Sequence, residues 1–325
     1  MRVLLVDNSQ YAPTTPFFKD ALQSEDLFFD EWEFGTGLRW FPFDIRAMNR
    51  ELLERARQHQ PHVVLVVKGM YLRRDTLAAV KADTGAIMVN YATDDPWNYA
   101  VSTPDLLASI PVYDLYCSVR KAVIPSILQS GCPRAEYVMC GYHPCLHRPP
   151  EAAVEPTSDV TLVGGADPDR VPYADALRIP GVRLALYGGY WDRIPRFRGY
   201  ARGVVPPDQY VEALWSTKIA VCLVRKANRD DHTMKSMELP ACGAFMLAQR
   251  TWAHESLFED GKTAALFSTP EDLADKVRYY LGHDEERERI RRAGLELVTK
   301  GGAHTYGARY RTMLGLADMV RIDRM

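Results

Sequence analysis

Hydrophobic residues occur along this chain in short runs separated by amphipathic segments. The runs VLLV (3–6), VVLVV (63–67), AIMVNYA (86–92) and VYDLYCS (112–118) are rich in strand-forming residues and bounded by polar residues, glycine or proline. They are typical of buried parallel strands. Between such runs, Met48, Leu52 and Ala56 recur at every fourth position, as on one face of a helix. The alternation predicts βα units and an open parallel sheet.

This pattern breaks once and then resumes. Residues 140–158 contain four prolines and no sustained period, which predicts a linker. Residues 271–298 predict two helices that separate near Gly282. Further strands are predicted at 159–165, 182–189, 218–224, 243–249 and 264–268.

Two successive α/β halves joined by this linker predict two domains with a cleft between them. We place an N-terminal domain at 1–148, a C-terminal domain at 149–305 and a terminal helix within 306–325. Ligands of open parallel sheets bind beyond the carboxyl ends of strands. The residues that follow the predicted strands are unusually polar or glycine-rich, and they include Lys68-Gly69, Thr93-Asp94-Asp95, Gly164-Gly165, Gly188-Gly189 and Arg225-Lys226.

Composition narrows the possible classes of protein. The 325 residues allow two domains of ordinary size, and 47% hydrophobic with 25% charged residues is usual for a globular protein. A net charge of -2 provides no general attraction to nucleic acid or membranes. Six scattered cysteines without a CxxC pair favour reduced thiols. With no signal-peptide core and no apolar run long enough to span a membrane, we expect a cytoplasmic protein.

One stretch, NRDDHTMKSMELPACG (228–243), concentrates charged residues before an apolar end. A helix from about Asp231 would place Asp231, Lys235 and Glu238 on one face and the methionines on the buried face. Asp230 or Asp231 would cap the first turn. Pro240 limits the length of this helix, and the following glycine suits a left-handed end.

The start of this predicted helix is suited to an anion. Free backbone N–H groups and the helix dipole would combine there with Arg225, Lys226 and Lys235 to hold a diphosphate. Glu238 would repel phosphates, but it can accept hydrogen bonds from vicinal hydroxyls such as those of a ribose. The structural alternative is an exposed, salt-bridged helix face with capping aspartates.

Residues 228–294 resemble the C-terminal half of the CgeB-like glycosyltransferases. The resemblance rests on HTMKSMELPACG (232–243) and HESLFEDGK (254–262), and it extends more weakly through SDVTLVGG, LYGGYW, YATDDPWN and CGYHPCLHRPP. It implies a GT-B fold, in which two Rossmann-like parallel-sheet domains face each other across a cleft. It also implies that the terminal helix packs back on the N-terminal domain.

The resemblance also implies roles for individual residues. The C-terminal domain would hold a nucleotide-diphosphate sugar, with Glu238 contacting the ribose. Asp230 occupies the position of the sugar-contacting acid, although the family has a glutamate there. Lys235, where relatives tend to have arginine, would assist the departure of the diphosphate together with Arg225 and Lys226. The donor side of the matched segments also includes His232, Gly164 and Gly165.

The candidates on the acceptor side are the two acids of TDDPW. Asp94 or Asp95 would orient or deprotonate an acceptor hydroxyl; the alternative is a cap or turn before Pro96. The Gly164-Gly165 pair is alternatively a tight turn. The spacing of His143 and His147 permits a metal, although packing at the linker is the favoured interpretation. Asp94-Asp95 is only superficially similar to a metal-binding DxD motif, and we expect no bound metal and no tightly bound cofactor.

The sequence therefore predicts a glycosyltransferase that moves a sugar from a UDP- or GDP-linked donor to an acceptor hydroxyl, with retention at the anomeric carbon. One alternative is a non-catalytic nucleotide-sugar-binding or surface-assembly protein. Another is a sugar-nucleotide epimerase of the same fold. The acceptor stays open among a glycan, a small molecule, a protein and a modified base, and so does the oligomeric state.

Overall fold

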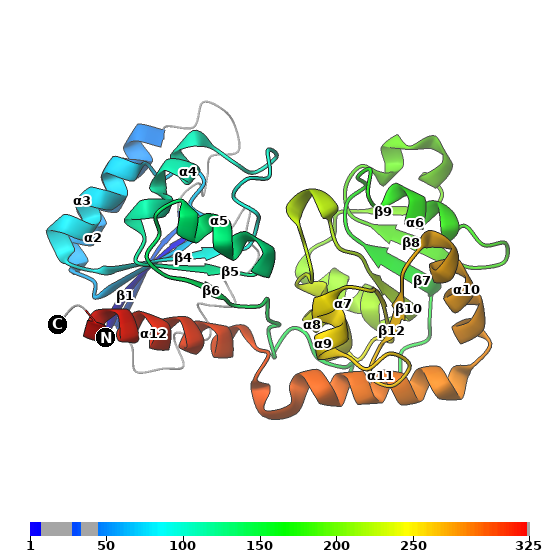
Figure 1. Ribbon diagram of the computed structural model, residues 1–325. Helices are drawn as coiled ribbons and strands as arrows, with labels where there is room; N and C mark the ends of the chain where they lie inside the picture. The colour runs from blue at the N-terminus through cyan, green and yellow to red at the C-terminus, as the bar shows by residue number, and fades with distance from the viewer. Residues whose placement is uncertain (8–27, 34–44, 324–325) are drawn as a thin grey trace. The chain divides into compact units, whose positions relative to one another are not determined.

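The computed structural model describes residues 1–7, 28–33 and 45–323 (Figure 1). The chain forms two compact units. Unit 1 comprises Met1–Cys140, Ala227–Arg229 and Tyr306–Met325, and unit 2 comprises Gly141–Lys226 and Asp230–Thr305. Each unit contains a six-stranded sheet, and every strand pair in both sheets is parallel. The prediction of two parallel α/β sheets is therefore confirmed.

The sheet of unit 1 has the strand order β2-β1-β3-β4-β5-β6. The apolar runs predicted as strands form β1, β3, β4 and β5, whereas β2 and β6 were not predicted. The strands span Arg2–Asp7 (β1), Phe28–Glu33 (β2), Val63–Val67 (β3), Ile87–Ala92 (β4), Leu115–Ser118 (β5) and Ala135–Tyr137 (β6).

Helices cover both faces of this sheet (Figure 1). The predicted face of α2, with Met48, Leu52 and Ala56, is buried in a core with side chains of the strands, α3 and α5. Helix α12, red in Figure 1, contacts β4 and β5. Thr103 caps α4, as its Thr-Pro sequence predicts. The helices of unit 1 are α2 (Ile45–His59), α3 (Arg74–Thr84), α4 (Pro104–Ser109), α5 (Ile124–Gln129) and α12 (Tyr306–Asp323), with 3-10 turns η1 (Ile110–Val112) and η2 (Lys121–Val123).

The sheet of unit 2 has the order β12-β11-β10-β7-β8-β9. Numbered from β7, this is the strand order 3-2-1-4-5-6 of a Rossmann fold. All five runs predicted after residue 158 form strands, and only the three-residue β9 was not predicted. The strands span Ser158–Val163 (β7), Leu184–Tyr187 (β8), Ala201–Gly203 (β9), Thr217–Cys222 (β10), Met246–Gln249 (β11) and Ala265–Phe267 (β12).

The helices of unit 2 also occupy both faces of its sheet. Side chains of α6 and α10 share a core with alternate strand residues such as Leu162 and Val221, and α8 contacts β10 and β11. The predicted break at Gly282 separates α10 from α11. The elements are α6 (Val171–Ala176), α7 (Pro207–Trp215), α8 (Lys235–Ala241), α9 (Trp252–Leu257), α10 (Pro270–Leu281) and α11 (Asp284–Thr299), with η3 (Trp191–Arg193), η4 (Pro195–Phe197), η5 (Lys226–Asn228, shared with unit 1) and η6 (Lys300–Gly302).

The segment predicted as a linker, 140–158, has no helix and enters a strand only at its last residue. It is nevertheless tied to unit 2. Tyr142 forms a parallel bridge with Thr305, and the indole of Trp215 donates a hydrogen bond to the carbonyl of Arg148 at 2.8 Å.

Two glycine-rich turns of unit 2 touch through their backbones. Gly188, after β8, has a φ of 121°, and a Cβ there would lie 2.5 Å from the carbonyl carbon of Gly164, which follows β7. Trp191 then donates from its indole to the carbonyl of Gly164 at 2.7 Å. Only glycine satisfies both the positive φ and this approach, which explains the first glycine of the pair in LYGGYW.

We expect Gly188→Ala to destabilise unit 2 by at least about 2 kcal/mol, because the methyl group must displace backbone atoms and the φ is strained for alanine. Gly315→Ala is the matched control, since it lies in α12 with nothing within 4 Å of its added Cβ. That change should be neutral or slightly stabilising. Thermal melts followed by circular dichroism compare the two, and equal melting temperatures would contradict the assigned contact.

Candidate functional site

The strand order locates a candidate site in unit 2. β7 and β10 are adjacent, and the chain leaves them in opposite directions across the sheet. Such a switch point is where open parallel sheets bind ligands, just beyond the carboxyl ends of the strands. The residues found there are Gly164-Gly165 after β7 and Arg225-Lys226 after β10. The structure thus brings four of the predicted donor-site residues to one sheet edge.

A cation that the sequence did not reveal lies against this glycine turn. Arg170 donates from Nη1 to the carbonyl of Gly165 at 3.0 Å and to Asp167 at 2.9 Å. Its Nε is buried and has no hydrogen-bond partner among the described residues. Burial lowers the pKa of this guanidinium. A side chain on Gly164 would meet Arg170, since a Cβ there would lie 3.0 Å from its Cζ.

The predicted cations after β10 have different surroundings. Arg225 contacts Asp230, whose buried carboxylate accepts from the Arg225 backbone N–H at 3.2 Å and lies 3.4 Å from Nε. Asp230 is therefore paired with Arg225 in this structure. Lys226 has an exposed side chain, and its backbone N–H donates to Asp169 at 3.0 Å.

The helix predicted from Asp231 begins only at Lys235. The hydroxyl of Thr251, the N-cap of α9, donates to the carbonyl of Asp231 at 2.6 Å. That carbonyl is the group a helix would use to accept the N–H of Lys235, which explains the late start. The predictions that Asp231 shares a helix face with Lys235 and that Asp230 or Asp231 caps the helix are therefore wrong. Asp231 instead contacts Nδ1 of the fully buried His232 at 2.7 Å.

The predicted charged face of α8 is also wrong. Every residue of this seven-residue helix after Lys235 is buried, including Glu238, which is 4% exposed. Pro240 lies in the helix, and Gly243 follows it with a φ of 72°, both as expected. The helix is buried because it packs between the sheet and α11.

The carboxylate of Glu238 lies against Tyr210, which the sequence did not reveal, and His147, which the sequence suggested only as a possible metal ligand. The hydroxyl of Tyr210 in α7 donates to Oε2 at 2.9 Å, and Nε2 of His147 lies 3.9 Å from Oε1. Burial raises the pKa of Tyr210 and lowers that of His147, so both side chains are neutral near pH 7. Oε1 accepts no hydrogen bond from a described residue. It is the oxygen of this carboxylate that a ligand hydroxyl can use.

Lys235 lies at the start of the same helix, one turn before Glu238. Its side chain is half-buried, and no described carboxylate forms an ion pair with it. A half-buried ammonium without a counter-ion is costly in a protein that has no anionic ligand. This residue therefore points to an anion site at the start of α8.

A buried hydrogen-bond chain fixes α8 to α9. The ring of His254 contacts the hydroxyl of Ser236 through Nε2 at 2.8 Å and the carbonyl of Gln249 through Nδ1 at 2.6 Å. Nδ1 must carry the proton to donate to a carbonyl. Burial lowers the pKa of His254 to about 4. The matched motifs HTMKSMELPACG and HESLFEDGK thus meet in space, and their serine and histidine position α8.

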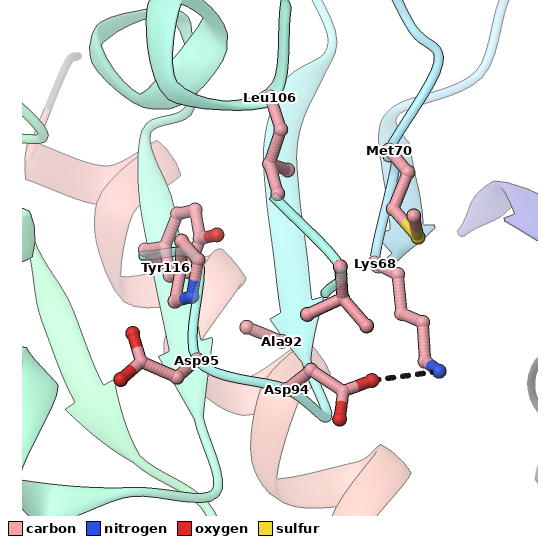
Figure 2. A pocket seen from close by; sticks show the side chains of 9 residues that line it. Lys68, Met70, Ala92, Asp94, Asp95, Leu106 and Tyr116 are labelled. Carbon is pink, nitrogen blue, oxygen red and sulfur yellow. Dashed lines mark ion pairs between the residues drawn. The ribbon is translucent and has the colours of Figure 1, made fainter. Parts of the chain in front are cut away.

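The two acids of unit 1 diverge (Figure 2). Asp94 forms a 2.8 Å ion pair with Lys68. Lys68 follows β3 and has a left-handed backbone conformation with a φ of 61°. Asp95 points the other way, and Arg229 donates to both of its oxygens. The switch point of this sheet lies between β1 and β3, so Lys68 belongs to it.

A small pocket lies between these strand ends and α4 (Figure 2). Its wall includes Lys68, Met70, Asp94, Asp95 and Tyr116. The hydroxyl of Tyr116 is buried and has no hydrogen-bond partner among the described residues. A ligand group or a water molecule in this pocket would satisfy it.

The histidines considered as metal ligands serve the backbone instead. Nδ1 of His147 accepts the N–H of His143 at 2.9 Å, and Nδ1 of His143 accepts the N–H of Leu146 at 3.2 Å. Across residues 1–7, 28–33 and 45–323, no group of three or more His, Cys, Asp or Glu side chains is arranged to hold a metal ion. No helix in those ranges has the length and apolarity needed to cross a membrane.

Residues 171–315 match the family model of glycosyl transferase-like proteins. This region contains α8, Glu238, Lys235 and the chain from β8 to the first half of α12. Among curated proteins, no sequence matches this chain.

Solved structures with the same architecture exist at low sequence identity. Anabaena Alr3699/HepE in complex with UDP-glucose superposes with a TM-score of 0.66 at 14% identity, covering 98% of this chain and 100% of that one. Sucrose-phosphate synthase from Thermosynechococcus elongatus superposes with a TM-score of 0.71 at 11% identity, covering 99% of this chain and 100% of that one. A candidate UDP-N-acetylglucosamine 2-epimerase from Listeria monocytogenes superposes with a TM-score of 0.58 at 12% identity, covering 100% of this chain and 97% of that one. The chain has the GT-B fold.

His254 predicts a specific pH dependence of stability. Burial lowers its folded pKa to about 4, below the usual histidine value of 6.5. The stability that it contributes is therefore complete above pH 6.5 and is lost as the pH falls toward 4, at about 1.4 kcal/mol per pH unit. When the pH is lowered from 7 to 5, the free energy of unfolding of the wild type should fall by roughly 2 kcal/mol more than that of His254→Gln. Denaturant unfolding measures this, and exposed His283→Gln is the control that should keep the wild-type slope.

Proposed function

We propose that this protein is a glycosyltransferase of the CgeB-like family that moves a sugar from a UDP- or GDP-linked donor to an acceptor hydroxyl. The observation that carries the proposal is that the half-buried Lys235, which has no ion-pair partner among the described residues, lies one helical turn from the buried Glu238. This pair lies in the region that matches the glycosyl transferase-like model. A cationic group can bind the pyrophosphate of such a donor, and a hydrogen-bond-accepting carboxylate can bind its ribose.

The donor would bind beyond the ends of β7 and β10. Lys235 and Arg225 supply positive charge for the diphosphate, and Glu238 accepts hydrogen bonds from the ribose hydroxyls through Oε1. The buried Nε of Arg170 offers a further donor toward the glycine turn. Asp230 retains its proposed contact with the donor sugar if Arg225 turns toward the phosphates, while His232 acts by shaping the loop beneath. That Anabaena Alr3699/HepE binds UDP-glucose supports this class of donor.

In the reaction, the bond between the anomeric carbon and the diphosphate oxygen breaks, and its electron pair leaves with the diphosphate. The acceptor oxygen forms the new bond to the anomeric carbon and loses its proton, for which Asp94 and Asp95 are the candidate acceptors. Lys235 and Arg225 stabilise the charge that develops on the leaving group. We propose transfer with retention and without a bound metal, as the family resemblance implies.

An epimerase is the second candidate, because a structural neighbour is a candidate UDP-N-acetylglucosamine 2-epimerase. An epimerase converts its sugar nucleotide without an acceptor, whereas a transferase requires one for turnover. Incubation with UDP-glucose, UDP-galactose, UDP-N-acetylglucosamine and GDP-mannose, with and without an acceptor panel, separates the two. Binding with no turnover in any arm would favour a non-catalytic or surface-assembly role.

We expect Glu238→Gln to weaken binding of the preferred nucleotide sugar about tenfold or more, because charge-assisted hydrogen bonds to hydroxyls are lost. Glutamine can still accept from Tyr210, so the fold should persist. Glu212→Gln on the exposed side of α7 is the matched control and should bind like wild type. Isothermal titration calorimetry gives the dissociation constants. Equal affinities for all three proteins would remove Glu238 from the site.

Lys235→Met should weaken binding of both the nucleotide sugar and the free nucleoside diphosphate, again by about tenfold or more, since a half-buried charge pair is lost. Lys235→Arg should recover most of the affinity. Lys300→Met removes an exposed lysine of unit 2 and should have no effect. If Lys235→Met weakens binding of the free nucleoside as much as it weakens binding of the nucleoside diphosphate, Lys235 does not contact the phosphates.

A further inference from the structure

A groove of unit 1 lies on the other side of Asp95 from the small pocket. It is lined by Asp95, Trp97, Ser126, Gln129 and Arg229, together with neighbouring small residues. The groove opens to bulk solvent, which accounts for part of its empty volume of about 930 Å³. None of the predicted donor-site residues lines it.

Trp97 is fixed in this groove with its ring accessible. Its backbone N–H donates to Asp95 at 2.9 Å, and the Arg229 guanidinium lies 5.8 Å from the centre of its ring. The side chain is 36% exposed. A half-exposed indole provides a flat apolar surface on which a ring can pack.

The turn that carries Asp95 and Trp97 is held in place by a buried amide. Oδ1 of Asn228, which is 0% exposed, accepts from the backbone N–H of Asp95 at 3.0 Å and from Nδ2 of Asn98 at 3.1 Å. Its own Nδ2 donates to Asp94 at 3.2 Å. The groove wall is therefore formed before any ligand binds.

The groove carries no excess charge. Arg229 donates from Nε and Nη2 to the two oxygens of Asp95, so the two charges neutralise each other. The other lining side chains are uncharged, and Ser126 and Gln129 offer a hydroxyl and an amide with no described side-chain partner. Phosphate or sulfate groups would find no free cation here, and a nucleic-acid strand would find no basic track.

We propose that this groove binds a neutral saccharide, which is the acceptor of the transfer proposed above. One face of a sugar ring carries C–H groups that pack on an indole, while its hydroxyls fit amide, hydroxyl and guanidinium partners around it. A lipid chain would leave the polar groups beside this indole without hydrogen-bond partners. The role of this saccharide as the acceptor rests on the proposed function, whereas the saccharide site itself does not.

The test measures saccharide binding without any donor. Lactose, maltotriose, cellotriose and N,N′-diacetylchitobiose are the neutral probes, and glucose 6-phosphate and sialyllactose are the anionic ones, each followed by saturation-transfer NMR and tryptophan fluorescence. We expect at least one neutral probe to bind and the anionic probes to bind more weakly. Trp97→Ala should lower the affinity for that probe about tenfold or more, and Trp97→Phe by less than about threefold.

Trp252→Ala, which removes another half-exposed tryptophan in unit 2, is the control and should leave saccharide binding unchanged. No binding of any neutral probe, preferential binding of the anionic probes, or equal affinity in Trp97→Ala would overturn the assignment. In turnover assays, Trp97→Ala should raise the acceptor KM and leave the donor KM within about twofold. If the donor binds but no neutral saccharide does, only this inference fails; if a saccharide binds but no donor does, only the proposed function fails.

Discussion

The parallel pairing of β7 with β10 is the constraint on which the candidate site depends. Their register places Leu162 opposite Val221, so both strands end at the same edge of the sheet, and the chain leaves that edge in two directions. A glycine turn follows one strand and a pair of cations follows the other. The contact of Gly188 with the backbone of Gly164 then fixes the first turn, and the hydrogen bonds of Thr251 and His254 fix the second with α8. The candidate site is thus positioned by the strand register together with a few buried contacts of the glycine turn, Thr251 and His254.

Buried charge determines what such a site can bind. Most of the acids at the strand ends have a cationic partner in the structure: Asp94 has Lys68, Asp95 has Arg229 and Asp230 has Arg225. Glu238 differs, because its partners Tyr210 and His147 are neutral near pH 7. Lys235 is the complementary case, because this half-buried cation forms no ion pair with a described acid. A ligand that carries both negative phosphates and hydroxyl donors would satisfy the two residues together.

The sequence was sufficient for most strands of the two sheets, because a fully buried parallel strand must be apolar on both faces and therefore appears as a continuous run. It missed β2, whose sequence FFDEWE is not a continuous apolar run. It also missed β6 and β9, which have three residues each and too little apolar content to produce a pattern. It also misplaced the start of α8, since the hydrogen bond that ends the preceding loop comes from Thr251, twenty residues away in sequence. Local patterns contain no information about such a partner.

The candidate site shows the same division. Glu238 and Lys235 were proposed from residue type and spacing. Tyr210 and Arg170 come from other segments and carried no signal of their own, and His147 was noted only as a possible metal ligand. A crystal structure with UDP bound is the most direct test of the account. It should show the diphosphate within hydrogen-bonding distance of the Lys235 ammonium and a ribose hydroxyl on Oε1 of Glu238. A nucleotide bound elsewhere, with these two side chains unchanged, would contradict it.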